Sequence, residues 1–250
     1  MNFEKSEHPR FAVLACVSFV GLCSPLAAQE LIEEEAPSWE SAVDFGLSAS
    51  RGNSDNMLFR FGVETAKKDD IDAYYGSVSY KYGEEKGTAN EDEILAKATW
   101  KHIIAGKNFF GLRMDARRDS FADIDYRVSF NATYGYYLID TDKTVFSAEA
   151  GLGMTFEDLG LGADSYLNGL IEQQFSHKFN DHAKVYQSIS YSPRLDHLED
   201  YRIEFEAGLE TKITKTVSFK FGLENRYASL PALGKKNNDL KLFSSLSYKF

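Results

Sequence analysis

Cysteine is nearly absent from this sequence. Only Cys16 and Cys23 occur, and both lie within residues 1–28, a segment that we expect to be removed. The mature chain would then contain no thiol. This excludes disulfide bonds and every haem or metal site that depends on cysteine.

Long apolar runs are missing as well. The run at residues 11–22 is too short for a spanning helix, which needs ~20 apolar residues. It follows Lys5 and Arg10 and is followed by small residues up to Ala28, an arrangement typical of a secretory signal peptide. We expect cleavage after Ala28, which leaves residues 29–38 as a flexible, acidic periplasmic lead-in.

A basic stripe is also lacking. The chain has 28 Lys and Arg residues against 38 Asp and Glu residues, for a net charge of -10, which argues against nucleic-acid binding. Mean hydropathy is -0.36, yet 14% of the residues are aromatic. The chain is therefore too polar for a helical membrane protein and aromatic-rich for a soluble one, and residues 39–250 fit one domain or one barrel.

Helical periodicity does not occur after Trp39. No window of ten or more residues sustains the spacing of an amphipathic helix, whereas apolar and polar residues alternate throughout. Successive side chains of a strand point to opposite sides, so each alternating stretch predicts a strand with one apolar and one polar face. Twelve strands are predicted, at residues 39–50, 57–66, 72–83, 93–104, 108–118, 126–138, 144–157, 165–178, 183–192, 201–213, 217–227 and 239–250.

The apolar faces of these strands carry no Asp, Glu or Lys. A soluble β-sandwich also alternates, but its outward face is hydrophilic and its edges are guarded by charge. Here the polar faces include Asn131, Thr133, Gly151 and Gly153 rather than a continuous charged coat. We therefore predict an all-β protein, a transmembrane antiparallel β-barrel of about 12 strands in the outer membrane.

The connections between the predicted strands alternate in length. In outer-membrane barrels the short turns face the periplasm and the longer loops face outward, so we expect both termini in the periplasm. The short connections are residues 67–71, 105–107, 139–143, 179–182 and 214–216. The longer ones are residues 51–56, 84–92, 119–125, 158–164, 193–200 and 228–238.

The last predicted strand ends the chain on an aromatic residue. Its apolar face includes Leu246, Tyr248 and Phe250. This end resembles the terminal strand of bacterial outer-membrane barrels, and the resemblance implies that the barrel-assembly machinery reads it as an insertion signal. Outer-membrane lipid and lipopolysaccharide are the other partners that such a location implies.

Several short motifs together resemble the YdiY-like family of outer membrane proteins described as salt-induced. The resemblance covers residues 39–250 and implies a location and a fold, without an established activity. The motifs are Trp39, Arg51-Gly52-Asn53-Ser54, Gly151-Leu152-Gly153, Tyr191-Ser192-Pro193 and Lys236-Asn237-Asn238-Asp239.

The polar faces of the strands predict the lining of the barrel lumen. They carry fourteen basic and nine acidic side chains, and a cationic lumen concentrates anions, which indicates a narrow pore for small anionic solutes. The alternative is a structural or salt-stress barrel filled by paired charges, because twelve strands lie between the ~8 that side chains fill and the ~16 that leave a channel. The candidate lumen-lining residues are Arg60, Lys81, Lys97, Lys101, Arg113, Asp115, Arg117, Arg127, Glu149, Glu172, Arg202, Glu204, Glu206, Lys220, Glu224 and Arg226. The other counted positions are Asp44, Glu64, Lys184, Glu210, Lys212, Lys241 and Lys249.

An outer-membrane phospholipase-like hydrolase is the weakest interpretation. It would need a serine, a histidine base and a third residue that orients the histidine. The sequence fixes no serine near His102, His177, His182 or His197. Carboxylates of the outer loops could bind divalent cations, but their spacing matches no calcium loop and fits acidic surface loops better. We expect no enzymatic activity, no cofactor and no metal site.

Overall fold

Twelve strands make up nearly all of the described chain. The computed structural model describes residues 38–50 and 56–250, without the side chains of residues 48–50 and 56. The predicted signal peptide, most of the lead-in and the Arg51-Gly52-Asn53-Ser54 motif lie outside these residues. The strands are β1 (Glu40–Ser50), β2 (Asn56–Lys68), β3 (Asp72–Glu85), β4 (Thr88–Ala105), β5 (Asn108–Asp119), β6 (Ile124–Asp140), β7 (Thr144–Asp158), β8 (Ala163–Lys178), β9 (Ala183–Pro193), β10 (Tyr201–Lys212), β11 (Val217–Ala228) and β12 (Asn238–Lys249).

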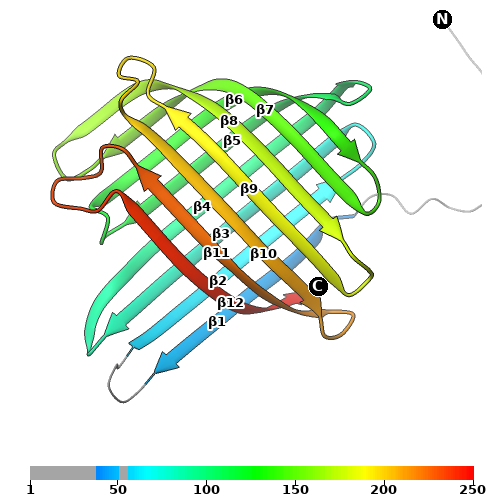
Figure 1. Cartoon of the computed structure of the whole chain (residues 1–250), viewed down its shortest axis with the longest axis horizontal. Coiled ribbons are helices and arrows are strands. Elements are labelled where there is room, and N and C mark those ends of the chain that lie inside the picture. Colours follow the sequence, from blue (N-terminus) through cyan, green and yellow to red (C-terminus); the bar gives the residue numbers. More distant parts are fainter. Residues whose placement is uncertain (1–37, 51–55) are drawn as a thin grey trace, which may run out of the picture. The chain divides into compact units, whose positions relative to one another are not determined.

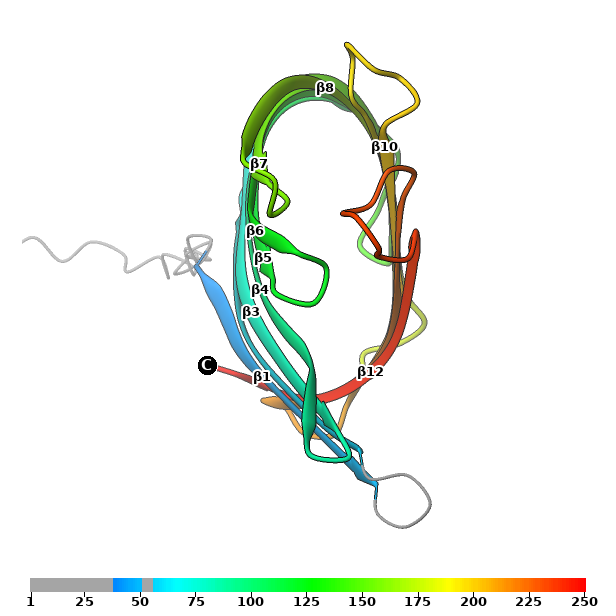
Figure 2. The same cartoon turned by 90° about the vertical axis from the view of Figure 1, so that its left-hand side faces the viewer.

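The strands form one closed antiparallel barrel. Each strand pairs with its neighbours in the sequence, and β1 pairs with β12 to close the ring (Figures 1 and 2). Closure leaves no sheet edge along most of the wall, which is a condition for spanning a membrane with strands. The predicted fold class and strand number are confirmed. No helix long and apolar enough to cross a membrane occurs in residues 38–50 or 56–250.

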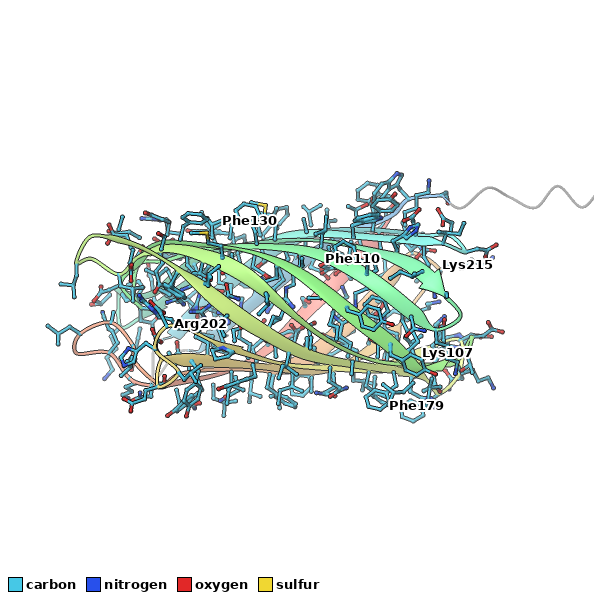
Figure 3. All side chains as sticks on the ribbon, turned by 90° about the horizontal axis from the view of Figure 1, so that it is seen from above. Lys107, Phe110, Phe130, Phe179, Arg202 and Lys215 are labelled. Carbon is cyan, nitrogen blue, oxygen red and sulfur yellow. The ribbon has the colours of Figure 1, made fainter. Side chains whose placement is uncertain are left out.

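The two faces of the wall meet different surroundings. On β6, Asn131 and Thr133 are 5% and 3% exposed, whereas Phe130 and Tyr134 on the opposite face are 48% and 58% exposed. Figure 3 shows Phe130 and Phe179 projecting away from the barrel, while Arg202 lies within it. Apolar side chains outside and polar ones inside are the pattern of a transmembrane barrel.

A lysine on the outer face is expected to destabilise the barrel. Leu152 lies near the middle of β7 and is 64% exposed, so Leu152→Lys would place a charge in hydrocarbon at a cost of about 2–4 kcal/mol. The matched control is Leu161→Lys, because Leu161 lies in the loop after β7 and is 83% exposed. Urea unfolding in lipid vesicles measures both variants, and equal stabilities would contradict a lipid-facing Leu152.

The β3–β4 connection differs from the prediction. Residues 84–92 were predicted as a loop, but β3 and β4 continue to Glu85 and from Thr88 and leave a two-residue turn. Lys86 and Gly87 both have positive φ angles, of 52° and 77°. A two-residue hairpin turn with positive φ at both positions matches the twist of the strands it joins. The extension carries Glu91 into the wall beside Glu93, so this outer connection is short rather than long.

Three of the aromatic side chains in the lumen each lie opposite a glycine on a neighbouring strand. The pairs are Phe109–Gly135, Tyr186–Gly208 and Phe243–Gly222. A Cβ atom on Gly135 would stand 2.2 Å from Cζ of Phe109, and one on Gly208 would stand 2.5 Å from Cζ of Tyr186. Each ring therefore lies flat against the wall where the glycine leaves room for it.

Candidate functional site

Glu93 is the centre of an ion-pair cluster in the lumen. Its side chain is 1% exposed and lies 3.4 Å from Nζ of Lys81, 3.0 Å from Nη2 of Arg117 and 4.0 Å from Nζ of Lys241. Its carboxylate also accepts a hydrogen bond from Arg226. These four cations come from β3, β5, β12 and β11, so a single carboxylate of β4 joins five strands.

Glu224 of β11 extends this cluster toward β2 and β3. Its carboxylate lies 2.7 Å from Nη1 of Arg60, 2.5 Å from Nζ of Lys81 and 3.4 Å from Nη2 of Arg226. In the ring, β4 and β11 are separated by β3, β2, β1 and β12. The contact between Glu93 and Arg226 therefore crosses the lumen rather than following the wall. We call Arg60, Lys81, Glu93, Arg117, Glu224, Arg226 and Lys241 the cross-lumen network.

The network satisfies charges that burial would otherwise make costly. Taking an ion out of water costs several kcal/mol, and only close partners of opposite charge repay it. Every carboxylate and every cation of the network has at least one such partner within 4.0 Å. Mutual satisfaction of this kind holds long side chains in fixed positions.

A second set of ion pairs fills the lumen beside β5 to β8. Nζ of Lys101 lies 3.0 Å from Glu149 of β7. Nε of Arg113 lies 2.6 Å from Asp115, and its Nη1 contacts Glu172 of β8. The contacts of Lys101 with Glu149 and of Arg113 with Glu172 skip two strands each, so they brace the inside of the wall.

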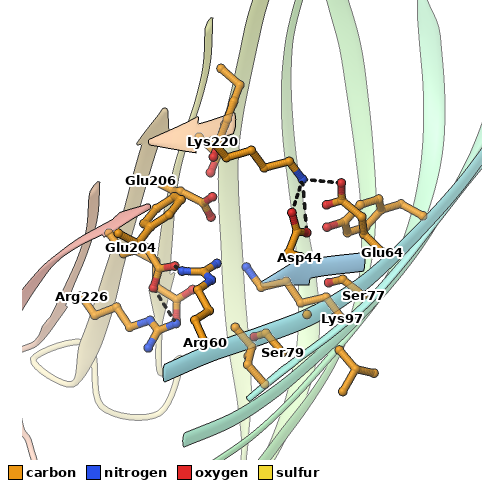
Figure 4. Close-up of a pocket in the computed structure, with 18 of the residues that line it drawn as sticks. Asp44, Arg60, Glu64, Ser77, Ser79, Lys97, Glu204, Glu206, Lys220 and Arg226 are labelled. Atoms are coloured by element: carbon orange, nitrogen blue, oxygen red, sulfur yellow. Dashed lines mark hydrogen bonds and ion pairs between the residues drawn. The ribbon is translucent and has the colours of Figure 1, made fainter. Parts of the chain in front are cut away.

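Two smaller groups lie nearer the ends of the barrel. Arg127 binds Glu157 at 2.5 Å, and the hydroxyl of Tyr166 donates to Glu157 and accepts from Arg202. In the other group, Nζ of Lys220 lies 3.1 Å from Asp44 and 2.5 Å from Glu64. Figure 4 shows Lys220 reaching across to Asp44 and Glu64, with Arg60 and Arg226 beside Glu204 and Glu206.

The space left between these groups is small. One cavity of about 150 Å³ includes Lys97, Glu204 and Glu206 in its lining, and another of about 50 Å³ lies beside Arg127 and Arg202. Pockets that hold small organic ligands usually measure ~300–1,000 Å³. A wider space of about 590 Å³ lies at the end with the short turns, next to residues such as Lys212. The lumen is thus open at that mouth and narrower beside Lys97, Glu204 and Arg127.

The structure brings the sixteen candidate lumen residues inside the barrel. Each is buried, ion-paired across the interior or part of a cavity lining. It also brings four acidic residues inside that the sequence count omitted: Glu91, Glu93, Asp119 and Glu157. With them the balance becomes fourteen basic to thirteen acidic residues, so the lumen is nearly neutral. Strict alternation would have found them, since Glu91 and Glu93 share the phase of Lys97, and Asp119 shares that of Arg117.

The candidate insertion signal lies on the outer face. Leu246, Tyr248 and Phe250 are 50%, 51% and 68% exposed. The first two belong to β12, and the amide of Phe250 still donates a hydrogen bond to the carbonyl of Ser41. Their recognition by the assembly machinery remains a prediction.

The histidines form no serine-containing triad in residues 38–50 and 56–250. Nδ1 of His102 lies 2.9 Å from Asp72, which also accepts a hydrogen bond from Trp100. Nδ1 of His177 lies 2.8 Å from Oγ1 of Thr144. His102 and Asp72 are placed like the base and the orienting carboxylate of a triad. The hydrogen bonds of the described residues, however, join no serine to either histidine.

The loop after β9 is held to β8 by Arg194. Its guanidinium donates to Asp164 at 2.6 Å and to Asp196 at 2.7 Å, and it stacks 4.2 Å from the ring centre of Tyr166. Two carboxylates that the sequence offered as cation ligands thus bind an arginine of the same chain. The hydrogen bond from Arg194 holds the pKa of Asp196 below its ordinary value.

This contact predicts a pH dependence of the loop. The folded-state pKa of Asp196 is lowered, so the ionised carboxylate stabilises the folded loop. This stabilisation is complete above the unfolded pKa of about 3.9 and is lost as the pH falls through the folded pKa. Arg194→Gln should raise the pKa of Asp196 to its ordinary value. Asp69 is the internal control, since backbone amides of Ile71 and Asp72 lower its pKa instead. Carboxyl ¹³C NMR measures both, and an unchanged Asp196 would refute the assignment.

Comparison with known proteins assigns the chain to a family. The family described as "Protein of unknown function, DUF481" matches residues 43–250. The chain belongs to this family. No curated protein matches, and no named relative supports the narrower YdiY-like assignment, which stays a prediction.

Solved structures similar to this DUF481 chain are barrels. The NanC porin has 8% sequence identity and a TM-score of 0.50, with 84% of this chain and 98% of that chain covered. The KdgM porin has 9% identity and a TM-score of 0.46, with coverage of 84% and 99%. The translocator domain of the autotransporter NalP from Neisseria meningitidis has 13% identity and a TM-score of 0.48, with coverage of 85% and 87%. At such identity the likeness to NanC supports the fold alone.

Proposed function

We propose that this protein is a non-enzymatic barrel of the outer membrane whose lumen is a narrow pore, closed to solutes by the cross-lumen network. The observation that carries the proposal is the set of four cations that Glu93 gathers from β3, β5, β11 and β12. Ion pairs that cross the interior obstruct passage along it, and rearrangement of these charges would open a path between them.

The charge balance changes the expected selectivity. The sequence count favoured small anionic solutes, but four further carboxylates lie inside and leave an excess of only one positive charge. We therefore infer weak selectivity between small anions and cations for any conducting state. The apolar outer face and the barrel fold support the outer membrane as its location.

Planar-bilayer recording of the refolded protein tests the proposal. Wild-type protein should give a quiet trace with rare, small steps, because ion pairs cross the lumen and the cavities between them near Lys97 and Arg127 measure about 150 Å³ and 50 Å³. Stable, large, anion-selective steps would instead support the open anion pore. A trace that stays flat even after the network is broken would support a structural barrel.

The sidedness of the barrel follows from the same proposal. With the short turns toward the periplasm, Leu161→Cys in the loop after β7 should react with an impermeant thiol reagent on intact cells. Lys107→Cys, at the opposite end in Figure 3, should not react. The reverse result would invert the proposed orientation.

A further inference from the structure

The barrel closes along only part of the β1–β12 seam. The two strands pair from Ala42–Lys249 to Phe45–Leu246. Beyond that point β1 stays paired with β2 to Ser50, and β12 stays paired with β11 to Asn238. Figures 1 and 2 show β1 and β12 meeting near the carboxyl terminus and diverging toward their other ends. Beyond this ladder the two strands therefore splay apart and leave a wedge between their backbones.

The strands part at Gly46 and Ser244. A Cβ atom on Gly46 would stand 2.5 Å from the carbonyl oxygen of Ser244, so the glycine lets β12 cross close to β1 where the ladder stops. Ser244 is exposed on the outer face of β12, between Leu242 and Leu246. Those leucines are 62% and 50% exposed, which puts the parting of the strands at the depth of the apolar surface.

The unpaired edge of β12 needs hydrogen-bond partners that hydrocarbon cannot supply. In lipid every unpaired backbone N–H or C=O costs several kcal/mol, and irregular backbone at membrane depth occurs where it lines a water-filled cavity or is covered by protein. Within the described chain, the edge of β12 from Leu240 to Ser245 has no ladder on its β1 side. Water from the lumen is the available partner.

A cavity of about 380 Å³ lies at this wedge and has two chemically different ends. Its lining includes Leu47, Phe221 and Leu242, which face outward, and Lys81 and Lys241, which face the lumen. The other charged groups of its lining are Arg60 and Glu91. Glu224 and Glu93 already pair with Arg60 and Lys81, so Lys241, at 25% exposed, is the cation of the lining that a ligand can reach. A site that is apolar toward the membrane and carries an accessible lysine toward the lumen fits an amphiphile with an anionic headgroup.

We propose that the open half of the β1–β12 seam is a hydrated lateral portal that binds a single-chain anionic amphiphile from the membrane. The chain of the amphiphile lies along Leu47, Phe221 and Leu242, and its headgroup points to Lys241. Lys241 is the accessible cation, since its side chain is 25% exposed and pairs with Glu91 at 2.9 Å near the edge of the network. This site is independent of whether the lumen conducts.

Thiol accessibility tests the hydration of the portal. In a background with Cys16→Ser and Cys23→Ser, Ser244→Cys is compared with Leu246→Cys, two residues along the same face in the paired part of the seam. The protein is reconstituted in phosphatidylcholine vesicles and treated with an uncharged, water-soluble maleimide. Ser244→Cys should react at least about tenfold faster, because thiolate chemistry requires water. Equal, slow rates would overturn the portal.

Protection from the same reagent tests the ligand class. Dodecyl phosphate added to the vesicles should protect Ser244→Cys in a saturable manner, whereas dodecyltrimethylammonium at the same mole fraction should not. Adding Lys241→Gln should abolish the protection by dodecyl phosphate. Equal protection by both amphiphiles, or protection that survives Lys241→Gln, would overturn the anionic ligand. Conductance is a separate readout, so this result and the proposed pore succeed or fail independently.

Discussion

Replacing Glu93 with glutamine is expected to turn the quiet barrel into a conducting one. The change removes the one carboxylate that Lys81, Arg117, Arg226 and Lys241 share, so these cations repel one another across the lumen. Bilayer recordings should show frequent steps with anion preference, because the lumen gains net positive charge. Removing one partner from a buried ion pair also costs about 3–5 kcal/mol, which should appear in urea unfolding as a lower free energy.

Glu91→Gln is the matched control for this variant. Glu91 lies two residues away on the same face of β4 and, among the residues that the structure describes, pairs only with Lys241, at 2.9 Å. Its loss should leave conductance quiet and stability within about 1 kcal/mol of wild type. If Glu93→Gln conducted no more than Glu91→Gln while remaining folded, the cross-lumen network would not be what closes the barrel.

Adding one methyl group at Gly135 is expected to destabilise the barrel. The new Cβ would overlap the ring of Phe109, which is fully buried and stacks on Tyr137 at 4.8 Å. Overpacking of this kind costs about 1–3 kcal/mol. Gly76→Ala is the control, since a Cβ there meets only Thr65, at an ordinary 3.5 Å.

A double-mutant cycle identifies the cause. Phe109→Ala alone should cost about 3–5 kcal/mol, because it empties a well-packed position. In the double variant with Gly135→Ala the methyl group no longer meets a ring. The double variant should therefore lose about 0.5–3 kcal/mol less stability than the sum of the losses of the two single variants. Strictly additive costs in urea unfolding would show that the ring and the glycine act separately.

Alternation in the sequence was enough to predict the wall. Side chains alternate between the two faces of a strand with a fixed period of two. The pattern of β6 therefore predicted both the strand and the surroundings of each face, with Val128, Phe130 and Tyr134 toward lipid and Asn131 and Thr133 toward the lumen. The same rule placed the sixteen candidate residues inside. It also predicted the closed ring, since a membrane tolerates no free edge.

The partners inside the lumen could not be predicted in this way. Glu93 and Arg226 are 133 residues apart, and which inward side chains meet depends on strand order and stagger. Phe109 and Phe243 broke the alternation, and only their register opposite Gly135 and Gly222 explains them. Likewise, the pattern of β12 gives no sign that its ladder with β1 stops at Leu246.

The distance in sequence between Glu93 and Arg226 sets an order of events during assembly. The two residues meet only after both halves of the chain have curved around to face each other, so their contact cannot guide the early hairpins into the membrane. The contact forms late, once the ring is complete. A contact that forms this late slows the unfolding of the finished barrel more than it speeds its folding.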